Sequence, residues 1–565
     1  MKIGGRRPGL AAAVALAVAV GGALTAGQQR IYWDDQVPDG WHGDWPAELL
    51  TPPERTDFTR TTTVEQLHEF VNTLRWRSEH LHTFNVFTTS FGRVAPALVL
   101  ANPRVTTPAQ ARQAGKAVIY LQGNIHPPEP EGTEALLMVM RDVLLGDKRH
   151  LLDNQVLVVV PIFNVDGTDI RSTQDGTPHL VGQRPNAQGF DLNRDAVKLE
   201  TTEVNALYRN VLNRWDPLLL VDLHLMSRVR HGYANTYAQS TVPAAHPGPR
   251  DYVWNQLFPA VRDAVRRDYG LETFTHALAD DAWPPTVWSH DNAIWSTEAK
   301  FVVSNYALRN RMSIITETPA HPTFERRIYA QYAYVMALLE YTNAHAKELI
   351  EVVAEADADT VARVEAQAES GELRNWLAGE YASWGQVDVL AYPDNQAAHI
   401  PGTSVRGTAP GMATGPPEVV SVEHLTKPVG TRDASVPRGY LIPAELGDLV
   451  DKLRTHNIRV ATLHAPMVAE GEAFVVDRLV EFRQSGFNLT RLEGTFTERT
   501  TREFPAGTFF VDMAQPMANA AFYYLEPQAA DGFVGWGLLD DILRARGVEA
   551  HPVVYPVFKY RRARE

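Results

Sequence analysis

Three apolar runs constrain the fold of this chain more than any other feature of its sequence. They cover Ala117–Leu121, Gln155–Ile162 and Leu218–Leu225, and each has the length and composition of a strand that is buried on both faces. Amphipathic helical patterns lie between and after these runs, as over Glu200–Trp215 and Arg250–Tyr269. Buried strands that alternate with helices predict an α/β fold, in which helices cover both faces of the sheet.

The composition excludes several kinds of chemistry. The 565-residue chain contains no cysteine, so it can form neither a disulfide nor a thiolate metal site, and histidine, aspartate or glutamate must hold any metal ion. The formal net charge of −14 disfavours nucleic acid as a partner.

The N-terminus has the three parts of a secretory signal. Lys2, Arg6 and Arg7 precede an uncharged stretch of small and apolar residues, and Thr25-Ala26-Gly27 follows it. We predict a signal peptide over residues 1–26 and a secreted or periplasmic, extracytoplasmic protein that leaves the membrane after cleavage. An uncleaved anchor is the alternative, and the arginine pair is compatible with twin-arginine export.

The rest of the chain divides into three predicted parts. Residues 27–63 look irregular, residues 64–350 form the predicted catalytic domain, and residues 370–565 form a smaller α+β accessory region of unknown role. The catalytic part opens with a predicted helix over Val64–His82, and 273–306 is expected to be a loop-rich insertion.

A histidine and a glutamate follow the first apolar run at a spacing that suits a metal. His126 and Glu129 lie on the loop between the run and the next helix, where one turn can aim both side chains at a single Zn²⁺. Glu131 and Glu134 are alternative carboxylate ligands, and Glu129 is preferred because Glu131 would project away from the turn that His126 faces. His224 is the candidate third ligand, because it lies near the end of a buried strand on the same face as Asp222. A surface histidine with a helix-start glutamate, and a core histidine, are the plainer interpretations.

Two further sites supply the remaining parts of a hydrolytic centre. Glu317 ends an apolar strand pattern, where a carboxylate is costly unless it is paired or used, so it is a candidate base for water. Asn193 and Arg194 can grip a planar carboxylate. The plainer alternatives are a solvated glutamate and an ordinary surface arginine.

The order of these motifs resembles the zinc carboxypeptidase (funnelin) family. It runs from His-x-x-Glu through Asn-x-Asp-Gly, Asp-Leu-Asn-Arg and Asp-Leu-His to a late strand that ends in Glu, and it covers roughly residues 60–345. The resemblance implies a mixed, mostly parallel eight-stranded sheet between helices and one Zn²⁺ per chain. It implies the metal ligands His126, Glu129 and His224, Glu317 as general base, and Asn193 and Arg194 as binders of the substrate's C-terminal carboxylate.

Two family positions match less closely, and one position departs. Arg184 is the preferred counterpart of the arginine that stabilises the oxyanion, with Arg171 as its rival. Tyr306 is the candidate for the substrate-binding tyrosine that precedes the base. Asp195 follows the Asn-Arg pair where asparagine is commoner, and it would weaken the binding of an anion if it pointed inward.

The sequence therefore predicts an exported zinc metallocarboxypeptidase that acts on peptides, or peptide-like substrates, with a free C-terminal carboxylate. A zinc amidase or deacylase for a non-protein or cell-wall amide is the first alternative. A binding protein that kept the fold without the activity is the second. Side-chain specificity and oligomeric state are not predicted.

Overall fold

The computed structural model describes residues 36–170, 181–226, 231–280, 282–290, 296–320, 322–392, 416–484 and 487–564. The predicted signal peptide and Arg171 lie outside these ranges. Within them, no helix is both long and apolar enough to cross a membrane.

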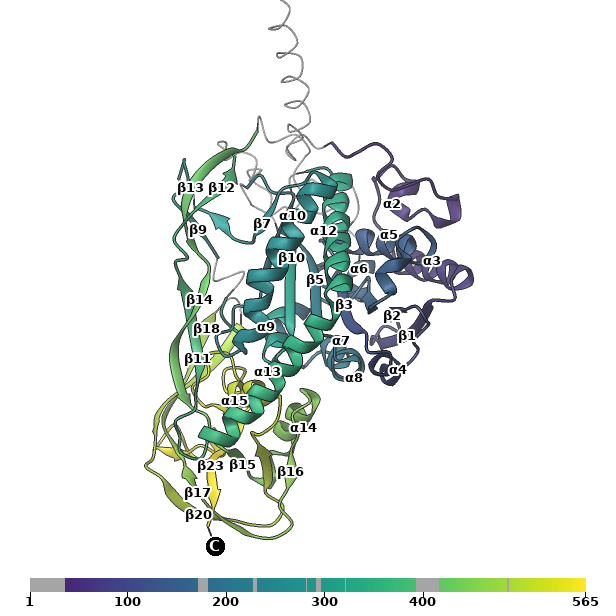
Figure 1. Cartoon of the computed structure of the whole chain (residues 1–565). Helices are drawn as coiled ribbons and strands as arrows, with labels where there is room; N and C mark the ends of the chain where they lie inside the picture. The colour runs from purple at the N-terminus through teal and green to yellow at the C-terminus, as the bar shows by residue number, and fades with distance from the viewer. Residues whose placement is uncertain are drawn as a thin grey trace, which may run out of the picture.

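An eight-stranded mixed sheet forms the centre of the predicted catalytic part (Figure 1). The neighbours β4–β3, β3–β5, β5–β10 and β6–β7 are parallel, and the other three pairs are antiparallel. The predicted α/β class and the mixed, mostly parallel eight-stranded sheet are confirmed. In spatial order the strands are β1 (Leu81–Thr88), β2 (Val94–Leu100), β4 (Gln155–Val160), β3 (Ala117–Gly123), β5 (Leu219–Met226), β10 (Met312–Pro319), β6 (Asn235–Gln239) and β7 (Thr273–Thr275).

Helices cover both faces of this sheet, as alternation along β10 shows. The Ser313 hydroxyl donates to the Val303 carbonyl in α11, whereas the Thr316 hydroxyl donates to Gln331 in α12. Positions three apart on a strand face opposite sides, so these helices lie on opposite faces. The helices of this part are α2 (Pro52–Arg55), α3 (Val64–Arg77), α4 (Pro108–Gln113), α5 (Glu131–Leu145), α6 (Val165–Asp169), α7 (Thr202–Ala206), a π-helical turn (Leu207–Leu212), α8 (Asn213–Trp215), α9 (Pro247–Tyr252), a second π-helical turn (Val253–Leu257), α10 (Phe258–Tyr269), α11 (Val302–Ala307), α12 (Phe324–Ala344) and α13 (Ala346–Gln367).

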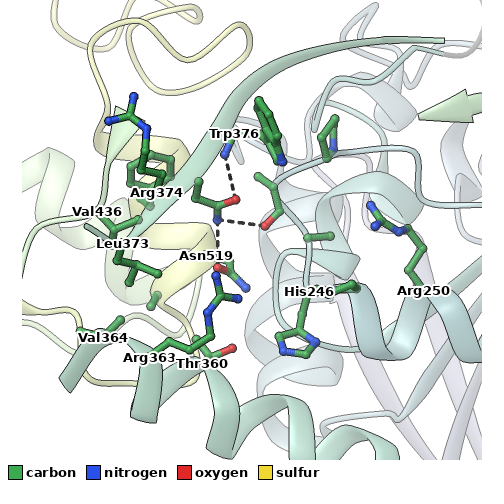
Figure 2. A pocket seen from close by; sticks show the side chains of 17 residues that line it. His246, Arg250, Thr360, Arg363, Val364, Leu373, Arg374, Trp376, Val436 and Asn519 are labelled. Carbon is green, nitrogen blue, oxygen red and sulfur yellow. Dashed lines mark hydrogen bonds between the residues drawn. The ribbon is translucent and has the colours of Figure 1, made fainter. Parts of the chain in front are cut away.

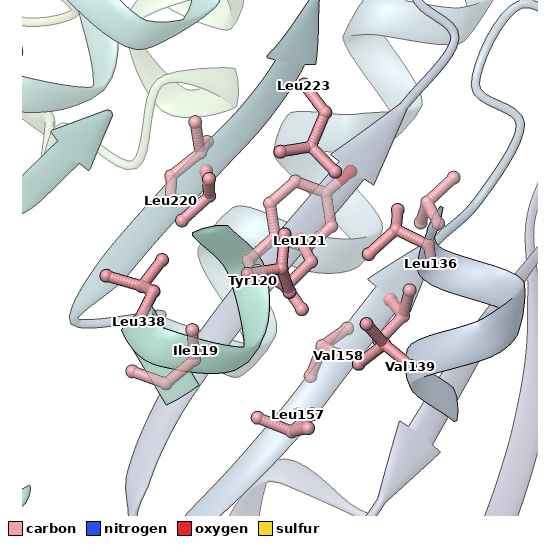
Figure 3. Packing of buried hydrophobic residues seen from close by; sticks show 14 of the residues in the cluster. Ile119, Tyr120, Leu121, Leu136, Val139, Leu157, Val158, Leu220, Leu223 and Leu338 are labelled. Atoms are coloured by element: carbon pink, nitrogen blue, oxygen red, sulfur yellow. The ribbon is translucent and has the colours of Figure 1, made fainter. Parts of the chain in front are cut away.

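The core between α5 and the sheet explains why the three runs are mostly apolar instead of alternating between apolar and polar residues. Every residue of β3, β4 and β5 is buried. Figure 3 shows Leu136 and Val139 of α5 facing Leu121 and Val158 of the strands. Helices bury both faces of each strand, so no polar alternation remains in the sequence.

The first predicted helix is shorter than expected. It ends at Arg77, and its C-cap Ser78 takes an extended conformation with φ −131° and ψ 128°. Leu81, which was predicted to continue the apolar face of the helix, opens β1 and pairs with Leu100. Tertiary strand pairing overrides the helical periodicity here.

The C-terminal region packs closely against the catalytic part rather than standing apart from it. Strand β9 (Val287–Ser289), from the predicted insertion, pairs in parallel with β13 (Glu418–Leu425), and β8 (Leu278–Ala279) and β12 (Gln386–Ala391) complete that sheet. One buried cluster joins Val197 and Ala299 to residues of the C-terminal region. The remaining elements are β11 (Arg374–Ala382) with β14 (Lys427–Ser435); β16 (Ala461–Thr462), β21 (Phe509–Asp512), β15 (Gly439–Ile442), β23 (Phe558–Ala563), β17 (Met467–Glu472) and β20 (Thr500–Phe504); β19 (Phe487–Phe496), β18 (Phe474–Gln484) and β22 (Val553–Val554); and helices α14 (Gly447–Thr455), α15 (Ala518–Leu525) and α16 (Asp540–Ala545).

Candidate metal centre and active site

The loop after β3 aims two side chains at one point. The Glu129 N–H donates to the His126 carbonyl at 2.9 Å, which closes a turn, and the Asn164 N–H donates to the Asn124 carbonyl, which ties this loop to the one after β4. The loop leads directly into α5, whose first turn lies against β5. A Cβ at Gly132 would come within 2.6 Å of the Leu223 Cβ, so this position admits only glycine.

His126, Glu129 and His224 form a compact buried group. One donor atom from each lies within 4.8 Å of the other two, and each side chain is only 3% exposed. His126 Nδ1 lies 3.2 Å from Glu129 Oε1, and His224 Nδ1 lies 2.8 Å from Glu129 Oε2. His126 Nδ1 makes no hydrogen bond within the described part of the chain. Two imidazoles and one carboxylate converging in this way fit one zinc ion.

Two aspartates orient the imidazoles from behind. Asp191 Oδ1 lies 3.0 Å from His126 Nε2, and Asp222 Oδ2 lies 3.0 Å from His224 Nε2. A carboxylate at Nε2 holds the proton there and leaves Nδ1 free to bind a metal. Sequence reasoning assigned no role to either aspartate, although Asp222 was placed on the same strand face as His224 and Asp191 opens the Asp-Leu-Asn-Arg motif.

Electrostatic coupling keeps the carboxylates of this centre charged. Burial disfavours the ionised form of Glu129, but the adjacent His126 and His224 lower its pKa well below the ordinary value. Burial likewise opposes ionisation of Asp191, yet His126, Arg194 and Arg184 lower its pKa well below normal. Both groups are therefore anionic acceptors at neutral pH.

Arg184, the preferred candidate for the oxyanion arginine, lies in this centre. Its Nη1 donates to Glu129 Oε1 at 3.1 Å, and its Nε donates to Asp191 Oδ2 at 3.0 Å. Burial opposes its charge, but Asp191, Glu129 and Glu317 raise its pKa above the ordinary value. The guanidinium thus stays cationic within reach of the metal group.

Glu317 reaches the centre through strand register. It is the Cα partner of His224 across the parallel β10–β5 pair, and paired residues of neighbouring strands project to the same face. Its side chain is 7% exposed, and the Thr236 hydroxyl donates to its backbone carbonyl. The carboxylate therefore lies next to a proposed metal ligand at the carboxyl end of the sheet.

Asn193 and Arg194 lie beside the metal group and are held by a neighbouring segment. Asn193 Oδ1 accepts a hydrogen bond from the Val302 N–H at 3.0 Å, which turns its amide nitrogen to within 3.5 Å of His224 Nε2. The Arg194 guanidinium lies over the Phe301 ring at 4.4 Å from the ring centre. The Asn193 amide thus lies beside a metal ligand, and the Arg194 charge acts on Asp191, which contacts His126.

Tyr306 lies elsewhere, and its predicted substrate contact is corrected. Its side chain is fully buried, and its hydroxyl donates to the Pro217 carbonyl at 2.6 Å. Pro217 precedes β5, so about 7 residues separate it from His224, or about 23 Å at about 3.3 Å per residue. Tyr306 lies within the buried helix α11, and the resemblance in spacing placed the tyrosine at the wrong end of the sheet.

The other acidic residues that were weighed take part in structural contacts. The Asp195 carboxylate accepts from the N–H groups of Glu200 and Thr201 and from the Thr201 hydroxyl. Glu131 pairs with Arg327 at 3.2 Å, and Glu134 accepts from Thr62. These contacts keep the side chains turned away from the metal group.

Comparisons with known proteins agree with this geometry. A family model described as zinc carboxypeptidase matches residues 69–214. The chain is 22% identical over 514 residues to carboxypeptidase 2 of Trichophyton equinum, covering 85% of this chain and 84% of that protein. It is 23% identical over 509 residues to a probable carboxypeptidase 2 of Arthroderma benhamiae, with 84% of each chain covered.

The chain is also similar to solved structures that are described as carboxypeptidases. The carboxypeptidase A of Helicoverpa armigera is 13% identical with a TM-score of 0.38, over 58% of this chain and 82% of that one. A metallo-carboxypeptidase of Burkholderia cenocepacia is 19% identical with a TM-score of 0.37, over 50% and 69%. Residues 69–214 thus match the zinc carboxypeptidase family, and the two-histidine, one-glutamate group that the structure brings together is a possible metal site.

Proposed function

We propose that this protein is an exported carboxypeptidase that removes the C-terminal residue of peptides, with His126, Glu129 and His224 holding the zinc ion. The observation that carries the proposal is that Glu317, Arg184 and the Asn193–Arg194 pair all border one buried ligand group. Zinc bound there would polarise the scissile carbonyl and lower the pKa of a coordinated water.

The protein's own groups then have separate tasks. Glu317 accepts a proton from the attacking water and later delivers it to the leaving amine. Arg184, held in place by Asp191, donates to the carbonyl oxygen as negative charge develops on it. Because Arg184 already donates to Glu129, substrate binding exchanges part of this contact for one with the oxyanion.

Selectivity for the end of a chain comes from the anion-binding pair. Arg194 offers a planar fork of donors, and Asn193 offers an amide nitrogen next to it, which together match a terminal carboxylate. An internal peptide bond presents no such group. The substrate is therefore placed with its last peptide bond, rather than an inner one, at the metal group.

A peptide assay tests both assignments. Glu317→Gln is expected to keep stoichiometric zinc and to lose hydrolysis by about 10²-fold or more, measured by release of free amino acids. Arg194→Ala is expected to lose most kcat/KM on peptides with a free C-terminus. A matched peptide with an amidated C-terminus serves as the control, and efficient cleavage of that peptide by the wild-type enzyme would instead indicate an amidase. N-terminal sequencing of the exported protein tests cleavage after residues 1–26.

A further inference from the structure

A cavity of about 210 Å³ lies where the catalytic part meets the C-terminal region. Its walls come from the loop before α9, from α13, from the start of β11 and from α15. Asn375 lines it, and its side-chain amide donates to the Ala244 carbonyl and to Asn519 Oδ1. We call this space the seam cavity, because residues of both regions line it.

The seam cavity is remote from the proposed active site. Asn310 donates to the Thr360 hydroxyl and accepts from Asn519, and both partners line the cavity. Asn310 precedes β10, whereas Glu317 lies near the other end of that strand. About 7 residues at about 3.3 Å each put some 23 Å of strand between them.

The charge of the lining is opposite to that of the chain. Arg250, Arg363, Arg374 and His246 line the cavity, and its described lining includes no aspartate or glutamate. The chain as a whole carries a formal charge of −14. A concave basic site on an acidic protein focuses positive potential on the space that it encloses.

Two of these arginines are poorly compensated. Arg374 forms two hydrogen bonds with Asp433, at 2.6 and 3.0 Å, and is thereby neutralised. Arg250 and Arg363 differ, since neither donates a hydrogen bond within the described residues, and each has a carboxylate no nearer than 3.8 Å. The partner of Arg363, Asp359, is already engaged with His246 at 2.9 Å.

Burial makes the charge on Arg250 costly. Desolvation lowers the pKa of Arg250 below its ordinary value, and Asp251 offsets only part of this effect. Arg250 comes from α9 and Arg363 from α13, and they flank the cavity on different sides (Figure 2). Two guanidinium groups that line one small space, neither of them hydrogen-bonded to a described protein atom, are suited to an anion that accepts from both.

We propose that the seam cavity binds a small oxyanion, a phosphate or carboxylate group, between Arg250 and Arg363. The volume is below the range of about 300–1,000 Å³ typical of pockets for drug-sized ligands, which favours an ion or a compact metabolite. Because the walls come from both regions, the bound anion stabilises their packing and raises the stability of the whole chain.

Binding to the full-length, zinc-loaded protein tests the proposal without reference to activity. Inorganic phosphate and acetate are titrated separately by calorimetry at constant ionic strength, and the thermal midpoint is followed as each replaces chloride. We expect saturable binding of at least one anion and a midpoint that rises with it. Tighter binding of phosphate would indicate a tetrahedral ligand, and tighter binding of acetate would indicate a planar one.

Substitutions locate the site. Arg363→Gln and Arg250→Gln are each expected to weaken binding about ten-fold or more, the usual cost of losing a hydrogen bond to a charged group, and to abolish the midpoint shift. Both side chains are partly exposed, so the fold is expected to persist. Arg267→Gln, at an exposed arginine paired with Asp268, is the matched control. Absence of saturable binding, or equal binding in all variants as with an adventitious ion only, overturns the proposal.

Discussion

Asp222→Asn is expected to cost the metal site much of its affinity while changing the volume of the side chain very little. Tyr120 donates its hydroxyl proton to Gln122 Oε1 at 2.7 Å, and this fixes the orientation of the Gln122 amide. Gln122 Nε2 in turn donates to Asp222 Oδ1 at 3.1 Å, and His224 Nε2 lies 3.0 Å from Oδ2. The carboxylate therefore accepts a hydrogen bond from Gln122 through one oxygen and makes a close charge contact with the His224 ring through the other.

An asparagine at position 222 cannot satisfy both neighbours. If its oxygen faces Gln122, its NH₂ group meets His224 Nε2 and favours the tautomer with the proton on Nδ1, which cannot bind a metal. If the amide is flipped, two NH₂ groups oppose each other at Gln122. Loss of such an outer carboxylate typically weakens metal binding about 10–100-fold, or about 1.4–2.7 kcal/mol.

Zinc affinity measured by competition with a chromogenic chelator checks this prediction. Asp142→Asn is the control, because Asp142 is also a largely buried acid that accepts from Tyr332 but belongs to α5 away from the metal group. The control should keep wild-type zinc affinity even if it is less stable. An Asp222→Asn protein that binds zinc within twofold of the wild type would refute the role given to the hydrogen-bond chain.

Two further predictions concern the packing of buried side chains. Phe301→Leu removes the ring under the Arg194 guanidinium. The KM for peptides with a free C-terminus should therefore rise about 2–5-fold, equivalent to about 0.5–1 kcal/mol, while the zinc content stays unchanged and Phe301→Tyr behaves like the wild type. An equal rise in KM for C-terminally amidated peptides would argue against this role of the ring. Burial lowers the pKa of His456 to about 3. Its Nε2 donates to the Val197 carbonyl, and its Nδ1 lies 3.3 Å from the Tyr524 hydroxyl. Because the folded pKa lies below the unfolded value of about 6.5, His456 contributes stability above about pH 6.5 that is lost as pH falls toward 3. Thermal midpoints recorded across this range should therefore decline more for the wild type than for His456→Gln, and parallel curves would contradict the assignment.

The sequence was sufficient to predict the elements that carry chemistry because their signals are local. A buried strand that ends beside His126 or His224 can be recognised from the run of apolar residues before it. The partners of these histidines are harder to recognise. Asp191 is 65 residues from His126 in the chain, and no local pattern distinguishes a carboxylate that orients an imidazole from one that caps a helix.

The predictions that were wrong relied on the periodicity or spacing of residues in the sequence, which does not determine their contacts in three dimensions. Leu81 fits the apolar face of the preceding helix but pairs with Leu100 in the sheet. Tyr306 lies close to Glu317 in sequence, yet the intervening strand carries the two to opposite ends of β10. Strand β9 could not be assigned to its sheet from sequence, because its partner β13 begins more than a hundred residues later.

The segment 297–301, which packs against the Asn193–Arg194 pair, is also held by the C-terminal region. The Thr297 hydroxyl donates to the Gly379 carbonyl of β11, and the Ala196 N–H, two residues after Arg194, donates to the Lys300 carbonyl. Phe301 follows directly and lies under the guanidinium. Residues 297–301 therefore connect β11 to Arg194, the residue proposed to hold the substrate carboxylate. This contact gives the C-terminal region a physical reason to accompany the catalytic part, because it fixes the position of Arg194 without contributing a side chain to the metal centre.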